Sequence, residues 1–253
     1  MKAAQITEPD KPLELNQIEL SEPTGNQVLL KVISTGVCHS DLHLWEGGYD
    51  TGDGFMKVTD RGVKFPVTPG HEVVGIVEKI GESVKDIKIG ETFLVYPWIG
   101  CGECPTCKKG DTNLCESPKS LGVFQDGGYA EKVIVPDYKF LANIGELDPD
   151  SASSLACSGL TAYTAIKKAL SNAPESILIV GAGGLGLMGI QLASHMTNCK
   201  IICADIDDQK LNTAKELGAT HVVNTKESDV SKNIMSITNE KGVDSIVDFV
   251  NAP

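Results

Sequence analysis

A glycine-rich turn between an apolar run and a helix-length segment is the feature that most restricts how this chain can fold. Residues 181–186 have the sequence G-A-G-G-L-G and directly follow the apolar run 176–180. Such a turn joins a buried parallel strand to a helix, because its glycines permit a tight reversal and close packing of the helix on the strand. The chain is therefore expected to contain a doubly wound α/β sheet.

Apolar runs and helix-length segments alternate from Ser151 onward, as they do in βαβ units. Each run is apolar throughout rather than at every second position, which is typical of parallel strands buried on both faces. The predicted strands are residues 176–180, 200–204, 221–223 and 245–250. The predicted helices between them are residues 185–196, 208–217 and 228–238.

The first half of the chain has a different pattern. From Lys2 to about Pro136, short β-branched runs are broken by glycine, proline and acidic turns, which predicts a mainly β, barrel-like domain. The predicted strands include residues 28–32, 73–77, 92–95 and 132–135. Residues 47–54 are rich in glycine and aspartate and predict a mobile surface loop, with an insertion without function as the alternative. We expect two domains, residues 1–158 and residues 159–253.

The glycine motif also predicts a dinucleotide site. Gly181 makes the tight turn, Gly183 lets a pyrophosphate approach the backbone, and Gly186 allows the helix to pack closely on the strand. The amides of Gly184 and Leu185 then point at phosphate from the N-terminus of the helix. A glycine-rich turn alone also serves simple packing, but here a predicted strand precedes it and a predicted helix follows it.

Asp205 indicates which dinucleotide is bound. It lies nineteen residues after Gly186, at the end of the next predicted strand. A carboxylate there accepts hydrogen bonds from the adenosine ribose and repels a 2′-phosphate, so NAD is favoured over NADP. The alternative is that Asp205 caps the following helix, although Asp207 and Asp208 are better placed for that role.

Charge and hydropathy exclude several classes of partner. The 34 acidic and 22 basic residues leave a net charge of −12, which repels phosphate backbones and anionic lipid surfaces. The N-terminal segment lacks the apolar run of a signal peptide, and no stretch approaches the ~20 apolar residues of a membrane span. We expect a cytoplasmic protein that binds neither nucleic acid nor membranes.

Four of the eight cysteines are closely spaced and predict a structural zinc site. Cys101, Cys104, Cys107 and Cys115 follow a pattern that lets a compact loop close around one ion. Four protein ligands leave no open position, so such a site is structural rather than catalytic. A redox-active pair would explain only two of these cysteines, and a nucleic-acid zinc finger requires basic charge that the chain lacks.

Two further segments resemble a known family. Residues 36–43 have the sequence G-V-C-H-S-D-L-H, and residues 70–84 match the zinc alcohol dehydrogenase signature G-H-E-x2-G-x5-G-x2-V. With the four-cysteine segment and the glycine motif, in this order, they make the chain resemble the medium-chain zinc alcohol dehydrogenases. The resemblance implies a GroES-like, mainly β catalytic domain followed by a Rossmann cofactor domain.

The resemblance also implies a second, catalytic zinc, bound by Cys38, His71 and Cys157, with a fourth position for water or substrate. Chemistry supports this ligand set, since catalytic zinc has three protein ligands and one open position, and two cysteines with one histidine are a known combination. The remaining cysteines, Cys199 and Cys203, lie beside or in an apolar run and are expected to be small buried apolar residues.

Four polar residues near these ligands gain roles from the same resemblance. Glu72 would lie behind the metal and Asp41 would orient the metal-bound histidine, although the alternatives are a surface carboxylate for Glu72 and a helix cap for Asp41. Ser40 would take the proton of the alcohol, and His43 would pass it through the cofactor ribose to water. The alternative for His43 is an ordinary solvent-exposed histidine.

The implied reaction is hydride transfer between an alcohol and NAD, with an aldehyde or ketone as the oxidised partner. Thr161 matches a position that touches the nicotinamide half of the cofactor, and Lys210 matches one that touches the adenosine ribose. Trp98 either lines the substrate pocket or is an aromatic residue of the core or of an interface.

The number of predicted strands indicates an incomplete cofactor domain. A complete doubly wound domain has about six strands, whereas only four runs follow Cys157. The chain by itself is therefore expected to be a poor catalyst, while the parent protein is expected to be a homodimer or homotetramer, as the family implies. Two alternatives stay open: a related enzyme acting on a polyol, an amino-acid alcohol or a semialdehyde, with NADP less favoured, and a non-enzymatic nucleotide-binding zinc protein.

Overall fold

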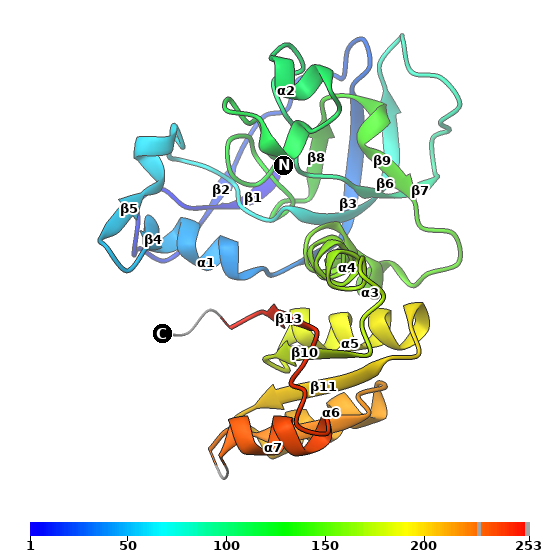
Figure 1. The fold of residues 1–253 in the computed structure, drawn as a ribbon. Helices are drawn as coiled ribbons and strands as arrows, with labels where there is room; N and C mark the ends of the chain where they lie inside the picture. The colour runs from blue at the N-terminus through cyan, green and yellow to red at the C-terminus, as the bar shows by residue number, and fades with distance from the viewer. Residues whose placement is uncertain (227–228, 251–253) are drawn as a thin grey trace. The chain divides into compact units, whose positions relative to one another are not determined.

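A computed structural model describes residues 1–226 and 229–250 of the chain. These residues form two compact units, Met1–Cys157 and the chain from Ser158 onward. The division falls one residue before the expected domain boundary. Figure 1 traces the helices and strands of each unit along the chain.

An antiparallel sheet of five strands lies at the centre of the first unit, with the order β8-β3-β6-β7-β9 (Figure 1). The strands are β3 (Val28–Gly36), β6 (Glu72–Ile80), β7 (Thr92–Val95), β8 (Lys132–Val135) and β9 (Leu141–Asn143). Alternate side chains of these strands point inward, and Leu30, Val77 and Val95 are fully buried in one core. The predicted mainly β domain is confirmed.

Two of these strands are longer than predicted, and their extra residues position the site. β3 continues to Gly36 and β6 begins at Glu72, and these two residues are paired across the sheet. The chain segments that follow β3 and precede β6 therefore start side by side. Cys38 lies in the first segment and His71 in the second.

Two short hairpins complete the strands of this unit. β1 (Lys2–Gln5) pairs with β2 (Glu14–Gln17), and β4 (Gly48–Asp50) pairs with β5 (Phe55–Lys57). The prediction of a surface loop at residues 47–54 is therefore wrong for residues 48–50, which form β4, and right for residues 51–54, which form the turn. The turn is stabilised locally, because Asp50 accepts the amide of Gly52 at 2.9 Å and Gly52 has φ +81, which glycine adopts without strain.

The helices of the first unit are short. Its α-helices are α1 (His39–Glu46), α2 (Pro105–Lys108) and α3 (Pro149–Ala152), and its 3-10 helices are η1 (Val58–Arg61), η2 (Thr112–Leu114), η3 (Tyr138–Phe140) and η4 (Ser153–Ala156). Helix α1 starts after the extended residue Cys38 and ends at Gly47, whose φ of +82 stops the helix. None of the described helices is long and apolar enough to cross a bilayer.

The second unit contains a parallel sheet of four strands with the order β12-β11-β10-β13. These strands are β10 (Ser176–Val180), β11 (Lys200–Asp205), β12 (His221–Asn224) and β13 (Ser245–Asp248). Chain order reverses direction between β10 and β13, which is where doubly wound sheets bind nucleotides at the carboxyl ends of their strands. The predicted doubly wound sheet is confirmed.

Helices cover both faces of this sheet. They are α4 (Ser158–Ala169), α5 (Gly184–Met196), α6 (Asp208–Glu216) and α7 (Val230–Ile237). Ile177 and Ile179 of β10 pack against α5 and α6, whereas Leu178 faces the other side, where α7 packs. The predicted start of the last helix, Ser228, lies outside the described residues.

Strand β13 differs from its prediction. Residues 245–250 were expected to form a strand buried on both faces, yet the strand ends at Asp248 and Ile246 is 62% exposed. Only Val247 is fully covered, at 7% exposure. The physical reason is position, because within the described residues β13 is an edge strand and helices cover only one of its faces.

Candidate zinc and nucleotide sites

The first candidate site lies where β3 ends and β6 begins. Cys38 caps the N-terminus of α1, His71 immediately precedes β6, and Cys157 follows η4. The sulfurs of Cys38 and Cys157 are 3.7 Å apart. A ring nitrogen of His71 lies within 4.8 Å of both sulfurs. The structure thus brings together three residues that are far apart in sequence.

The His71 side chain is oriented for binding a metal. It is 1% exposed, and its Nδ1 lies 3.3 Å from Oδ1 of Asp41. Both ring nitrogens are buried and neither forms a hydrogen bond among the described residues, so Nδ1 faces Asp41 as an ion-pair contact and Nε2 is left unpaired. Because a buried polar atom is normally paired, a nitrogen left unpaired beside two cysteine sulfurs fits a metal ligand.

The spacing of the sulfurs fits zinc. Thiolates about 2.3 Å from a tetrahedral ion are about 3.8 Å apart, and the Cys38–Cys157 separation is 3.7 Å. Two sulfurs and one imidazole nitrogen occupy three corners of such a tetrahedron, so a fourth corner is left for water or substrate. The donor set is thus the catalytic type that the sequence predicts.

The charges of the cluster also favour a bound cation. The hydrogen bond with Cys157, together with contacts with His71, lowers the pKa of Cys38 to about 4 against the effect of burial. Burial disfavours a charged imidazole, but contacts with Asp41 and Cys38 raise the pKa of His71 to about 10. The cluster therefore stabilises positive charge next to a thiolate, and a metal cation bound by the neutral imidazole would supply that charge in place of a proton.

Asp41 and Glu72 are both buried, at 5% and 2% exposure. Asp41 accepts the amide of Cys38 at 2.9 Å and also faces His71, so it caps α1 and contacts the histidine at once. The alternative of a surface carboxylate for Glu72 is excluded by its burial. Room for the Glu72 carboxylate depends on Gly36, because a Cβ at position 36 would lie within van der Waals overlap of its Oε2.

Ser40 and His43 lie on α1, in the first and second turns after Cys38. The His43 side chain is 32% exposed, and its Nδ1 lies 3.2 Å from Oε2 of Glu46. Its ring contacts those of His39 and Tyr49 in tilted arrangements, with centroid distances of 4.8 and 4.7 Å. His43 is therefore held in place on a half-exposed helix face, as a group that passes protons to solvent requires.

Trp98 lies next to the candidate metal ligand His71 rather than in a remote core. Its ring centroid is 5.5 Å from that of His71 and tilted by 53°. Sequence reasoning proposed Trp98 for a substrate pocket but missed three aromatic rings of this region: His39, Tyr49 and Tyr129. No spacing rule connects these residues to Cys38 or His71, so only the structure identifies them.

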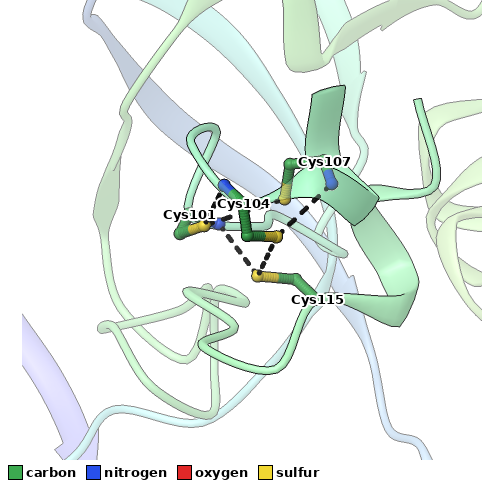
Figure 2. Close-up of side chains that lie close together, drawn as sticks. All are labelled: Cys101, Cys104, Cys107 and Cys115. Carbon is green, nitrogen blue, oxygen red and sulfur yellow. Dashed lines mark hydrogen bonds between the residues drawn. The ribbon is translucent and has the colours of Figure 1, made fainter. Parts of the chain in front are cut away.

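The second candidate site is the loop that contains Cys101, Cys104, Cys107 and Cys115, called the four-cysteine lobe below (Figure 2). The sulfurs of Cys101 and Cys107 are 3.9 Å apart and those of Cys104 and Cys115 are 3.8 Å apart. Both distances match the edge of a zinc–thiolate tetrahedron, about 3.8 Å. All four sulfurs lie within 4.8 Å of one another.

Backbone amides surround this lobe and stabilise thiolates. Cys101 Sγ accepts from the amides of Glu103 and Cys104 at 3.5 and 3.3 Å, and these bonds lower the pKa of Cys101 to about 6. The amide of Gly102 acts in the same direction on Cys107, but burial and the neighbouring sulfurs raise its pKa to about 12. Four thiolates cannot coexist here without a cation, which is the charge balance expected of a structural zinc site.

The two other cysteines lie in the second unit. Cys203 is fully buried in β11, and burial raises the pKa of its thiol to about 12. Cys199 is half-buried and packs against the same core. The prediction that they are apolar core residues is confirmed for Cys203 and holds in part for Cys199.

The glycine turn of the second unit has the geometry that its sequence predicts. Gly181 has φ +92, and a Cβ at Gly186 would overlap the carbonyl oxygen of Gly181. Gly183 and Gly184 are exposed at the start of α5, and a Cβ at either would meet no atom within 4 Å. The backbone of these two glycines and of half-buried Leu185 is thus open to a phosphate at the helix N-terminus.

Asp205 connects the glycine turn to the end of β11. Its Oδ2 accepts the amide of Ala182 at 2.6 Å and its Oδ1 accepts the amide of Asp207 at 3.0 Å. Asp207, and not Asp205, caps α6, because it accepts the amides of Gln209 and Lys210. Each oxygen of Asp205 retains a second lone pair that can accept from a ribose hydroxyl.

Lys210 and Thr161 are both exposed, on the first turns of α6 and α4 respectively. Lys210 lies five residues after Asp205, on the helix that follows β11. Nothing in the second unit by itself assigns a role to Thr161.

Comparison with known proteins places the chain in a family. Residues 24–146 match the alcohol dehydrogenase GroES-like domain, and residues 184–253 match the zinc-binding dehydrogenase family. An NAD-dependent alcohol dehydrogenase of Saccharolobus solfataricus is 42% identical over 253 residues, which are 100% of this chain and 72% of that protein. The chain is a medium-chain, zinc-dependent alcohol dehydrogenase by family.

Two other members of this dehydrogenase family are similar over the whole chain. The crystal structure of the alcohol dehydrogenase from Aeropyrum pernix has a TM-score of 0.87 and 33% identity, and the match covers 100% of this chain and 72% of that one. An L-threonine 3-dehydrogenase of Pyrococcus horikoshii is 34% identical over 100% of this chain and 70% of that protein. The Rossmann domain of this dehydrogenase chain is thus partial relative to these proteins, in agreement with the four strands among its described residues.

Proposed function

We propose that this chain, as part of its parent protein, oxidises an alcohol with NAD, or reduces the matching aldehyde or ketone, at a zinc ion held by Cys38, His71 and Cys157. The observation that carries the proposal is the buried, unpartnered Nε2 of His71 beside two cysteine sulfurs that are 3.7 Å apart. When bound, zinc acts as a Lewis acid on the substrate oxygen. The lobe of Cys101, Cys104, Cys107 and Cys115 holds a second, structural zinc.

The residues around the catalytic ligands have separate tasks. Asp41 keeps the His71 ring in its orientation, and Glu72 lies buried directly beside it as a nearby carboxylate that can assist ligand exchange. Ser40 accepts the proton of the alcohol hydroxyl. His43 then carries this proton toward solvent, which its half-exposed position on α1 allows.

The cofactor binds through the glycine turn and the end of β11. The exposed backbone of Gly183 and Gly184, at the N-terminus of α5, receives the pyrophosphate. Asp205 accepts hydrogen bonds from the adenosine ribose, and its charge disfavours NADP. Lys210 assists at the same ribose, and Thr161 contacts the nicotinamide half.

Two zinc ions per chain are the first expected outcome, because the two ligand clusters share no residue. A chelator should remove the catalytic zinc first and abolish NAD reduction, since that site has an open position. Zinc content by mass spectrometry, followed through chelation and re-addition of zinc, tests this. A chain that keeps full activity with one zinc would contradict the proposal.

Asp205→Asn should weaken NAD binding about 10- to 100-fold, because hydrogen bonds to a charged acceptor contribute about 1.5–3 kcal/mol. The same change should improve NADP binding, since the repelling charge is gone. Dissociation constants for both cofactors measure the effect. Asp208→Asn is the matched control, because it neutralises an exposed aspartate whose partner is Asn224 rather than the glycine turn. A wild-type preference for NADPH would overturn the role of Asp205.

The substrate is tested by a screen on the full-length protein with both nicotinamides. We expect activity on primary or secondary alcohols. The L-threonine 3-dehydrogenase relative, at 34% identity, makes an amino-acid alcohol the second candidate. A chain with both zinc sites filled that oxidises no alcohol would favour the non-enzymatic alternative.

A cytoplasmic location and assembly into a homodimer or homotetramer are parts of this proposal. Thiolate ligands require a reducing compartment, which supports the location. The family supports the assembly.

A further inference from the structure

We propose that Tyr129 is a positioning residue for the zinc ligand His71 and acts through a hydrogen bond from its hydroxyl to Asp41. This inference rests on the zinc site proposed above. Tyr129 lies 88 residues from Asp41 in sequence and belongs to none of the motifs that predicted the site.

Asp41 is the point where the two ligand-bearing segments meet. Its Oδ1 accepts the amide of Gly70 at 3.1 Å and faces Nδ1 of His71 at 3.3 Å. Its Oδ2 accepts the amide of Cys38 at 2.9 Å and lies 3.3 Å from the hydroxyl of Tyr129. The orientation of this one carboxylate therefore determines how His71 is held relative to Cys38.

The tyrosine hydroxyl has two acceptors within reach and one proton to donate. The carbonyl oxygen of Gly36 lies at 3.5 Å, farther away than the carboxylate of Asp41. A charged acceptor forms the stronger hydrogen bond, so the proton is directed at Asp41. Burial, and then the negative charge of Asp41, raises the pKa of Tyr129 well above its usual range, so the hydroxyl remains a donor.

The ring of Tyr129 is held against the backbone that leads into His71. Gly70 has φ +91, and a Cβ there would overlap atom Cδ1 of the tyrosine ring. The amide of Tyr129 donates to the carbonyl of Pro69 at 3.0 Å, and the amide of Gly128 donates to the carbonyl of Gly70 at 2.7 Å. Residues 69–70 and 128–129 thus form one packed unit behind the histidine.

This arrangement has a direct consequence for zinc. An imidazole that binds metal through Nε2 needs an acceptor at Nδ1, and a carboxylate that can rotate is a poorer acceptor. The Tyr129 hydroxyl restrains the oxygen of Asp41 that does not face His71. Removing the hydroxyl should loosen the carboxylate, and with it the imidazole, without removing any zinc ligand.

The test is Tyr129→Phe, which keeps the ring against Gly70 and removes only the hydroxyl. Partners of this kind typically contribute about 10- to 100-fold to metal affinity, so we expect the catalytic zinc to bind about 10-fold more weakly in chelator competition. The visible spectrum of the chain with Co²⁺ at that site should also shift. A residue that only maintains the fold would not move this spectrum. The four-cysteine zinc serves as an internal standard and should keep its affinity.

Tyr138→Phe is the matched control, because it removes a tyrosine hydroxyl from η3 of the same unit, and it should leave both readouts unchanged. Wild-type affinity and an unchanged Co²⁺ spectrum in Tyr129→Phe would overturn this inference alone. A wild-type chain that binds no second zinc would overturn the proposed function instead. Equal zinc loss from both clusters in Tyr129→Phe would mean damage to the fold and would also count against the positioning role.

Discussion

Cys38→Ser is expected to leave one zinc per chain and to lower turnover about 10³-fold or more, since zinc contributes several kcal/mol of charge stabilisation to the reaction. Serine is a good N-cap residue, so α1 should still form and the loss should trace to the metal alone. Zinc content, turnover and far-ultraviolet circular dichroism together measure the effect.

Cys199→Ser is the control for Cys38→Ser, because it removes a thiol that belongs to neither cluster. It should keep two zinc ions and full turnover. Retention of both zinc ions in Cys38→Ser would remove Cys38 from the ligand set. A similar loss in Cys157→Ser is expected, because its sulfur occupies the neighbouring corner of the same tetrahedron, 3.7 Å away.

Ser40→Ala and His43→Ala should each slow alcohol oxidation about 10²- to 10⁴-fold, because a positioned proton acceptor contributes that much. The loss of rate in His43→Ala should be greatest at low pH. It should become smaller as pH rises, because hydroxide becomes abundant and takes the proton directly. Ser40→Ala should be the more damaging of the two, because it removes the first acceptor. Profiles of turnover against pH for both variants test this.

His195→Ala is the control for the two proton-relay variants, Ser40→Ala and His43→Ala. His195 lies in the last turn of α5 and contacts Gln191 of the same helix. Its pH profile should match that of the wild type. Zinc content should stay at two in every relay variant. An unchanged rate in His43→Ala, or loss of zinc from it, would assign His43 to another role.

Local sequence was sufficient for the elements whose geometry depends on neighbouring residues. The turn from Gly181 to Gly186 needs glycine for a positive φ and for close approach of two backbone segments, and both requirements are visible in the sequence. The four cysteines of the lobe lie within one short loop, so their spacing alone predicts that their sulfurs can meet. Local sequence was also sufficient to predict β10, which precedes the glycine turn, and α5, which starts within it.

Two errors came from features that depend on partners outside the segment from which they were predicted. The hairpin of β4 and β5 was predicted as a loop, because glycine and aspartate signal a turn without revealing that the flanking residues pair. The exposure of Ile246 was missed because burial of a strand depends on which elements cover it, and an apolar run is the same on an edge as in the centre of a sheet.

The sequence by itself predicted a four-cysteine zinc site and a dinucleotide site, because each of these motifs is contiguous and has its own physical reason, whereas the dehydrogenase activity and the second zinc site followed from the family resemblance. Tertiary structure alone decided how Cys38 and Cys157, 119 residues apart, come within 3.7 Å, and which tyrosine contacts Asp41. The pairing of Gly36 with Glu72 brings the ligand segments together. The register of that pairing is set by the packing of the whole sheet, and it cannot be predicted from residue spacing along the chain.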